Sequence, residues 1–267
     1  MKSPGVTIRK LHQMKRDRQP IAMLTAYDAG FARLLDRCGI DCILVGDSLG
    51  NVIQGRDSTV PVTVAEMAYH VACVRRGTER ALLIADLPFL SYSDTGQAIR
   101  SAKRLMQAGA EMVKLEGGAA VLEQVAALSR LGVPVCGHLG LTPQSVHHLS
   151  GYRVQGRTPD EQQRLIEDAA ALERAGASML VVECIPDALA RHLTGASGIP
   201  VIGIGAGAGV DGQVLVLYDV LGLYAGHTPR FVRDFLSGSA SLDDAIEGYV
   251  EAVRRGRFPG SGESFGD

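Results

Sequence analysis

The stretch AGAEMVKLEGG, residues 108–118, contains the pattern that decides the fold of this chain. A glycine that can end a helix is followed by a short apolar run, and the run closes on an acidic residue. Residues 38–48 (CGIDCILVGDS) and 175–185 (AGASMLVVECI) repeat this form. Lys114 and Glu116 stand two positions apart in the apolar run, so in a β-strand both side chains point to the same face. The stretch therefore predicts a strand that carries a polar pair on one face.

Apolar runs of strand length recur along the chain. They are rich in Val, Ile and Leu and rarely alternate with polar residues, which is typical of parallel strands covered on both faces. We predict strands at 21–26, 42–46, 81–85, 112–116, 133–137, 179–183 and 200–204, with 214–218 and 219–223 as candidates for an eighth. Helical patterns lie between them, at 63–76, 95–108 and 160–175. About eight such alternations in roughly 250 residues favour an α/β fold, the (βα)₈ TIM barrel with a parallel closed sheet and outer helices, over an open doubly wound sheet.

Length and composition are consistent with a single catalytic domain spanning residues 1–267. The chain is 46% apolar and has a net charge of −2, without a polybasic run or an apolar run long enough to cross a bilayer. We therefore expect no nucleic-acid or membrane partner. The polar N-terminal segment, about 1–20, does not read as a secretory signal, and the tail at about 259–267 is expected to be disordered. The five cysteines include no C-x-x-C pair and read as buried thiols in a reducing cytoplasm.

Charged side chains stand at or just after the ends of five predicted strands. They are Asp47, Asp86, Glu116, His138 and Glu183. In a barrel the carboxyl ends of the strands meet at one mouth, so we expect these side chains to converge there, with Lys114 slightly deeper. An acid after a strand is often a helix N-cap instead, but the shared placement of all of them favours a site. Burying a lysine among carboxylates is costly unless they pair or bind a metal.

Three carboxylates without a Cys–His cluster suit a hard divalent ion such as Mg²⁺, which prefers oxygen ligands. We expect Asp47 and Asp86 to bind the ion directly, and Glu116 to bind it directly or through water. Such an ion would chelate a 2-oxo acid through its ketone and one carboxylate oxygen. It would then stabilise the enolate that forms when a proton leaves the neighbouring carbon.

The remaining residues of the group suggest roles in substrate binding and proton transfer. Lys114 would neutralise the remaining carboxylate charge of the substrate, helped by the Ser48 hydroxyl. Glu183, on a different strand, is free to act as the base. His138 would orient a ligand or stabilise an oxyanion, or it would be a structural, hydrogen-bonded histidine.

The glycine-rich run GIGAGAG, residues 203–209, does not have the G-x-G-x-x-G spacing and comes late in the chain. Both points argue against a dinucleotide site. A phosphate cradle stays open as an alternative, but we favour glycines that let the backbone pack close to a bulky ligand.

Nine segments, taken together and in order, closely resemble the ketopantoate hydroxymethyltransferase family. They are TAYD (25–28), LVGDSLG (44–50), DSTVPVT (57–63), ADLPF (85–89), VKLEGG (113–118), VPVCGHLGLTPQS (133–145), VQGR (154–157), VVECIP (181–186) and PVIGIGAG (200–207). The resemblance runs from about residue 25 to about residue 259. Each segment alone is a weak signal, whereas the ordered set is highly specific.

The resemblance implies a (βα)₈ barrel of the phosphoenolpyruvate/pyruvate type and a cytoplasmic enzyme of pantothenate, and hence coenzyme A, biosynthesis. The implied reaction transfers a hydroxymethyl group from 5,10-methylenetetrahydrofolate to 3-methyl-2-oxobutanoate, giving 2-dehydropantoate through a Mg²⁺-stabilised enolate. A homo-oligomer, typically a decamer, is also implied. The family's metal carboxylates match Asp47, Asp86 and Glu116, and its oxo-acid contacts match Asp47, Ser48, Asp86 and Lys114. Its general base matches Glu183, and one of its active-site histidines matches His138.

Two alternatives stay open at this point. One is another Mg²⁺-dependent, enolate-forming lyase or mutase that acts on a small 2-oxo acid, although that reading does not predict the GHLGLTPQS and VQGR segments. The other is an inactive barrel that serves as a binding or scaffold protein. The complete set of acids, lysine and base argues against this second alternative.

Overall fold

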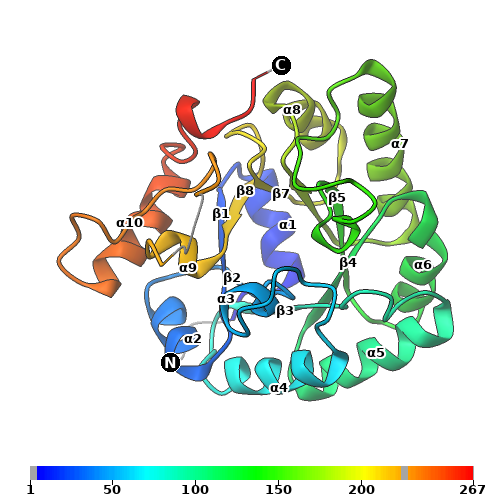
Figure 1. The fold of residues 1–267 in the computed structure, drawn as a ribbon, viewed down its shortest axis with the longest axis horizontal. Coiled ribbons are helices and arrows are strands. Elements are labelled where there is room, and N and C mark those ends of the chain that lie inside the picture. Colours follow the sequence, from blue (N-terminus) through cyan, green and yellow to red (C-terminus); the bar gives the residue numbers. More distant parts are fainter. Residues whose placement is uncertain (1–4, 224–227, 267) are drawn as a thin grey trace.

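Eight parallel strands close into a barrel in their sequence order in the computed structural model, which describes residues 5–223 and 228–266 (Figure 1). The strands are β1 (Ile21–Thr25), β2 (Cys42–Val45), β3 (Leu82–Asp86), β4 (Met112–Glu116), β5 (Val135–Gly140), β6 (Met179–Glu183), β7 (Val201–Ile204) and β8 (Gly212–Leu215). The predicted (βα)₈ barrel is therefore confirmed. Each of the first seven strands lies within three residues of its predicted bounds.

The eighth strand differs most from the prediction. It begins two residues before the first candidate segment, and the second candidate is wrong because Leu217–Val220 forms the short helix α9. The prediction missed the first two residues of the strand, Gly212 and Gln213, because neither is an apolar residue type that extends a strand pattern. Gln213 is nevertheless buried, and its side-chain amide donates a hydrogen bond to the carbonyl of Gly207 at 3.0 Å.

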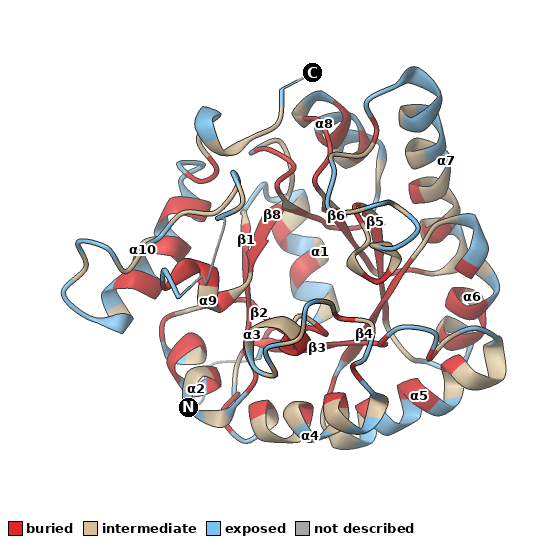
Figure 2. Cartoon of the chain, viewed as in Figure 1, coloured by how far each residue is buried: buried red, intermediate tan, exposed pale blue. Residues whose placement is uncertain are grey.

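Helices surround the barrel, and their buried residues face the strands (Figure 2). The outer helices are α2 (Ala29–Arg37), α4 (Val64–Arg75), α5 (Thr95–Ala108), α6 (Leu122–Arg130), α7 (Pro159–Ala175), α8 (Asp187–Ala196) and α10 (Leu242–Arg254). Local sequence signals place several of their ends. Helices α4 and α7 each begin with a capping box, formed by Thr63 with Glu66 and by Thr158 with Glu161. In the part of the chain that the structure describes, no helix is long and apolar enough to cross a membrane.

The alternation of side chains along β4 divides the molecule into two apolar clusters. Val113 and Leu115 point outward into the large cluster between the sheet and the helices. Met112 points inward, into a smaller cluster that fills the barrel. Lys114 and Glu116 share the inward face with Met112, as the period of two predicts.

The N-terminal segment contains a helix that the sequence analysis did not predict. Helix α1 (Ile8–Arg16) is seen through the ring of strands in the view of Figure 1. Its Leu11 and Met14 are buried in the cluster that fills the barrel. This helix therefore closes the end of the barrel at which the strands begin, and the functional side chains gather at the opposite end.

The C-terminal tail also differs from the expectation of disorder. Its described residues follow a defined path that includes the 3₁₀ turn η3 (Ser261–Glu263). Glu263 pairs with Arg233 at 2.6 Å, and the Phe265 carbonyl accepts a hydrogen bond from the backbone of Asp187 at 3.2 Å. A side chain at Gly205 would meet Phe231 and Phe265. The glycine-rich run thus packs closely against protein side chains at this point, and the tail is ordered by these contacts.

Candidate active site

Strands β2 to β6 bring the predicted site residues together at one end of the barrel. We define the strand-end cluster as Asp47, Asp86, Lys114, Glu116, His138 and Glu183. The strand register aligns them, because Asp86 pairs with Lys114 across β3 and β4, and Glu116 pairs with His138 across β4 and β5. All six are buried except Glu183, which is half-buried. In the described part of the chain none of these acids caps a helix, so the N-cap alternative does not apply to them.

Lys114 is held by its neighbours in the middle of the cluster. Its Nζ lies 2.9 Å from Asp86 Oδ1 and 3.3 Å from His138 Nδ1. Burial by itself would lower the pKa of Lys114, but the charges of Asp86, Glu116 and Asp47 outweigh burial and raise the pKa above its ordinary value. The lysine is therefore a permanent cation beneath the mouth of the barrel.

Asp47 and Glu116 carry more negative charge than Lys114 can compensate. Burial, followed by repulsion from Asp86 and Glu116, raises the pKa of Asp47 well above its ordinary value. Burial also raises the pKa of Glu116 to about 7, with Lys114 opposing the shift and Asp86 adding to it. Both shifts show that the site favours an added positive charge.

The donor set fits a divalent cation on chemical grounds. Three buried carboxylates, those of Asp47, Asp86 and Glu116, face a single ammonium group, and oxygen is the ligand that hard cations prefer. Over residues 5–223 and 228–266, no three His, Cys, Asp or Glu side chains are drawn together as a preformed metal site. In this structure the carboxylates have protein partners: Lys114 engages Asp86, and Gln144 donates hydrogen bonds to Asp47 Oδ2 and Glu116 Oε2.

His138 connects the carboxylates to Glu183. Its Nδ1 lies 3.4 Å from Glu116 Oε1, and its Nε2 lies 3.2 Å from Glu183 Oε2. Burial and the charge of Lys114 lower the pKa of His138, so the imidazole is neutral. Because an ammonium group can only donate, we assign Nδ1 as the acceptor from Lys114 and place the proton on Nε2, facing Glu183.

Glu183 is placed by unusual backbone on both sides of it. Burial raises its pKa, and the hydrogen bond with His138 opposes that shift. The next residue, Cys184, has a φ of 49°, and Gly140 on the neighbouring strand has a φ of 90°. A Cβ on Gly140 would lie 2.2 Å from the carbonyl oxygen of Glu183. Only glycine therefore allows the ends of β5 and β6 to approach this closely.

Ser48 lies next to the cluster, at the end of β2. Its hydroxyl is 2.8 Å from the hydroxyl of Tyr27. A Cβ on Gly46 would lie 2.8 Å from Ser48 Oγ and 3.5 Å from Asp86 Oδ2, so both oxygens face the same point of the backbone. The structure thus places every predicted site residue in one neighbourhood.

Sequence reasoning missed three residues that contact this group: Tyr27, Tyr92 and Gln144. Tyr27 and Gln144 lie within the TAYD and VPVCGHLGLTPQS segments, so the resemblance marked their neighbourhood without assigning them a role. Tyr92 lies outside all nine segments. Its hydroxyl donates a hydrogen bond to Gln144 Oε1 at 2.7 Å, and no local sequence pattern predicts this contact.

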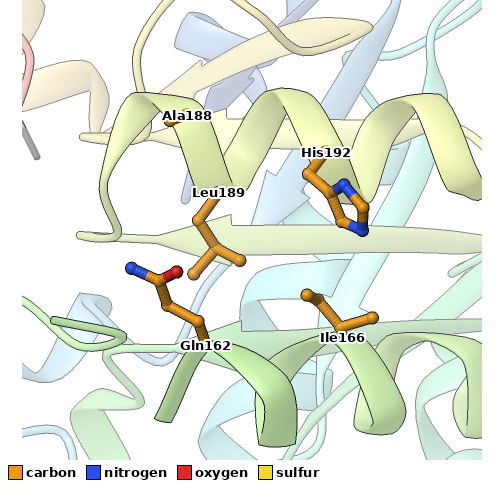
Figure 3. Close-up of a pocket in the computed structure, with 5 residues that line it drawn as sticks. All are labelled: Gln162, Ile166, Ala188, Leu189 and His192. Carbon is orange, nitrogen blue, oxygen red and sulfur yellow. The ribbon is translucent and has the colours of Figure 1, made fainter. Parts of the chain in front are cut away.

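A surface pocket elsewhere lies between α7 and α8. In Figure 3, Gln162 and Ile166 of α7 face Leu189 and His192 of α8. These residues are on the outer layer of helices and contain no member of the strand-end cluster. The pocket therefore does not replace the barrel mouth as the candidate active site.

The sequence of this chain is similar to those of known proteins along nearly its whole length. The family model described as ketopantoate hydroxymethyltransferase matches residues 5–261. A 3-methyl-2-oxobutanoate hydroxymethyltransferase 2 of Hahella chejuensis is 54% identical over 261 residues, covering 98% of this chain and 99% of the relative. A 3-methyl-2-oxobutanoate hydroxymethyltransferase of Shewanella sp. (strain MR-7) is 55% identical, covering 97% and 98%.

Solved structures share the barrel at much lower sequence identity. A putative phosphonomutase from Burkholderia cenocepacia has a TM-score of 0.62 at 20% identity, covering 80% of this chain and 95% of its own. A phosphonopyruvate hydrolase, in complex with oxalate and Mg²⁺, has a TM-score of 0.61 at 13% identity, covering 94% and 96%. These likenesses bear on the fold alone. The match of the family model to nearly the whole sequence, together with relatives more than half identical along it, shows that the chain belongs to the ketopantoate hydroxymethyltransferase family.

Proposed function

We propose that this enzyme transfers the methylene carbon of 5,10-methylenetetrahydrofolate to C3 of 3-methyl-2-oxobutanoate as a hydroxymethyl group, with water supplying the hydroxyl and tetrahydrofolate leaving, and so forms 2-dehydropantoate in pantothenate biosynthesis. The names of the close relatives support the substrate and the reaction class. The observation that carries the proposal is the buried Lys114, which stands among three carboxylates on one side of His138 while Glu183 stands on the other. Such a site can hold a small anion and remove a proton from it.

The proposal includes Mg²⁺, with Asp47, Asp86 and Glu116 as the residues that would hold it. The excess of buried carboxylate charge over the single ammonium of Lys114 supports this assignment. When bound, a divalent cation supplies Lewis-acid polarisation of the ketone of an oxo acid. Lys114 provides the fixed positive charge for the substrate carboxylate, and the Ser48 hydroxyl provides a hydrogen bond beside it.

Glu183 is the proposed general base. It takes the proton from C3 of the oxo acid, and the electron pair of the broken C–H bond stays on the substrate as an enolate. His138 acts on the base, because its Nε2 atom lies 3.2 Å from Glu183 Oε2 and its effect on the Glu183 pKa opposes that of burial. His138 thereby orients the carboxylate and offsets part of the rise in its pKa that burial causes.

We further propose that the chain acts as one catalytic domain in a cytoplasmic homo-oligomer, without a nucleic-acid or membrane partner. The closed barrel that the strands of the described residues form supports the single domain. The resemblance of the sequence supports self-association, which the sedimentation of the purified protein would measure.

The experiment that tests the reaction follows the C3 proton of 3-methyl-2-oxobutanoate by NMR in D₂O. Unaltered enzyme should replace this proton with solvent deuterium when Mg²⁺ is present but not when EDTA is present. It should form a hydroxymethyl product once 5,10-methylenetetrahydrofolate is added. Glu183→Gln should abolish the exchange, since the amide keeps the shape of the side chain and can still accept from His138 but cannot take a proton.

Two outcomes would contradict the proposal. Absence of exchange by folded enzyme in all conditions would rule out the transferase chemistry. Cleavage of the oxo acid without folate would instead favour the lyase alternative.

A further inference from the structure

Gln144 reaches into the strand-end cluster from the loop that follows β5. It lies in the short 3₁₀ turn η2 (Pro143–Ser145), and its side chain is buried. Its Nε2 donates to Asp47 Oδ2 at 2.8 Å and to the carbonyl of Leu87 at 3.0 Å. Both protons of the amide are therefore used, one on a carboxylate after β2 and one on the backbone after β3.

The backbone of Gln144 holds a second carboxylate. Its N–H donates to Glu116 Oε2 at 3.0 Å, at the end of β4. One residue of the loop thus binds one oxygen of Asp47 and one oxygen of Glu116. It does so without adding a charge to a site that already contains Lys114.

Tyr92 contacts the amide oxygen of Gln144 and supports the direction in which the amide points. Its hydroxyl lies 2.7 Å from Gln144 Oε1 and 3.4 Å from the backbone nitrogen of Glu116. The hydroxyl also lies 3.3 Å from the carbonyl oxygen of Glu116, a second acceptor, but the shorter distance to Gln144 Oε1 favours the amide oxygen as the acceptor of its proton. The reversed amide would turn its oxygen towards two acceptors, Asp47 Oδ2 and the carbonyl of Leu87, so the orientation that directs Nε2 at Asp47 is favoured.

We propose that Gln144, oriented by Tyr92, is a positioning residue that sets the spacing of the Asp47 and Glu116 carboxylates for a divalent cation. The proposal rests on the proposed function, since it assigns the cation to that same site. Residues that hydrogen-bond to the ligands of a metal ion, without contacting the ion, contribute to the affinity of the site for that ion. Gln144 fits this description, because it holds one oxygen of each carboxylate and leaves the other oxygen of each to the site.

The test measures the affinity of the metal-free, full-length enzyme for Mn²⁺ by electron paramagnetic resonance, with no substrate present. Gln144→Met should weaken Mn²⁺ binding about tenfold or more, the range seen when such supporting partners are removed. Tyr92→Phe removes only the hydroxyl and should weaken binding by a smaller factor. It also keeps the proposal testable if the methionine variant does not fold.

Gln124 offers a matched control. It is also a buried glutamine, and its amide donates to the carbonyl of Tyr92 at 3.2 Å, but it contacts no carboxylate of the cluster. Gln124→Met should lower the melting temperature through the loss of a buried amide and leave the Mn²⁺ affinity unchanged. Comparing the two variants separates positioning from general support of the loop.

Each other outcome has a definite meaning. Unchanged Mn²⁺ affinity in Gln144→Met, or an equal loss in Gln124→Met, would overturn the role of Gln144 while leaving the proposed reaction intact. Failure of the unaltered enzyme to bind Mn²⁺ would overturn the proposed cation and the role of Gln144 with it. The C3 exchange assay reports on the transferase reaction separately.

Discussion

Replacing Lys114 with methionine should destabilise the protein because the change leaves buried carboxylates without their cation. The Nζ of Lys114 lies 2.9 Å from Asp86 Oδ1, and the side chains are only 5% and 4% exposed. Two unit charges at this separation attract by about 6 kcal/mol at an effective dielectric constant of about 20. Desolvation offsets part of this attraction, and removing one partner of a buried pair costs about 3–5 kcal/mol. We expect Lys114→Met to lower the free energy of unfolding by about 3–5 kcal/mol.

Urea unfolding of metal-free protein at pH 8 and a fixed protein concentration would measure the loss. The comparison needs Lys114→Met, Asp86→Asn and the double variant. Each single variant leaves an unpaired buried charge, so the double variant should be more stable than the sum of the single losses predicts. Lys15→Met is the control, because Lys15 pairs with Asp211 at 2.6 Å in a more exposed place and should cost less.

Two results would refute this reasoning. A loss below about 1 kcal/mol in Lys114→Met would mean that the ammonium contributes no more than an exposed ion pair does. Additive losses in the double variant would mean that Lys114 and Asp86 do not interact strongly, whatever their distance.

Two further predictions concern Glu116 and Gly140. Burial raises the pKa of Glu116 from 4.5 to about 7, so this group stabilises the metal-free fold at low pH, and about 3 kcal/mol of stability is lost as the pH rises from about 4.5 through about 7. Urea unfolding across this range should show the fall and saturating Mg²⁺ should reduce it, whereas a flat profile would contradict the shift. Gly140→Ala should lower the melting temperature more than Gly132→Ala. Both positions have a positive φ, but only at Gly140 would the new Cβ lie 2.2 Å from a backbone atom, the carbonyl oxygen of Glu183. The alanine at position 140 should also slow C3 exchange about a hundredfold by displacing the base, and equal effects of the two alanines would show that the close approach does not position Glu183.

Much of the barrel could be predicted because its signals are local. The apolar runs, the capping boxes of α4 and α7 and the glycines after α5 and α7 each depend on residues close in sequence. The period of two along β4 predicted that Lys114 and Glu116 share a face, and the parallel order of the strands then predicted that their ends meet. The candidate site could be named for the same reason, since the charged residues stand at or near the ends of apolar runs that are recognisable one by one.

The ordered tail could not be predicted in this way, and neither could helix α1, which closes the end of the barrel where the strands begin. The tail is polar and glycine-rich, and it is held by Arg233 and by the backbone of Asp187, which are distant in sequence. Helix α1 is short and mostly polar, and its two buried residues gain their environment only when the barrel has closed around them. Neither segment carries enough local signal to show its partner.

The sequence by itself determined the (βα)₈ fold and the identity of the charged residues at the strand ends, because periodicity and spacing act within a few residues of the chain. Only the tertiary structure decided where the eighth strand begins and which partners the carboxylates have. Gln213 is buried by contacts across the barrel, and Gln144 meets Asp47 across 97 positions of sequence. Such contacts depend on the closure of the whole barrel, which brings together hydrogen-bonding groups that no short stretch of sequence contains.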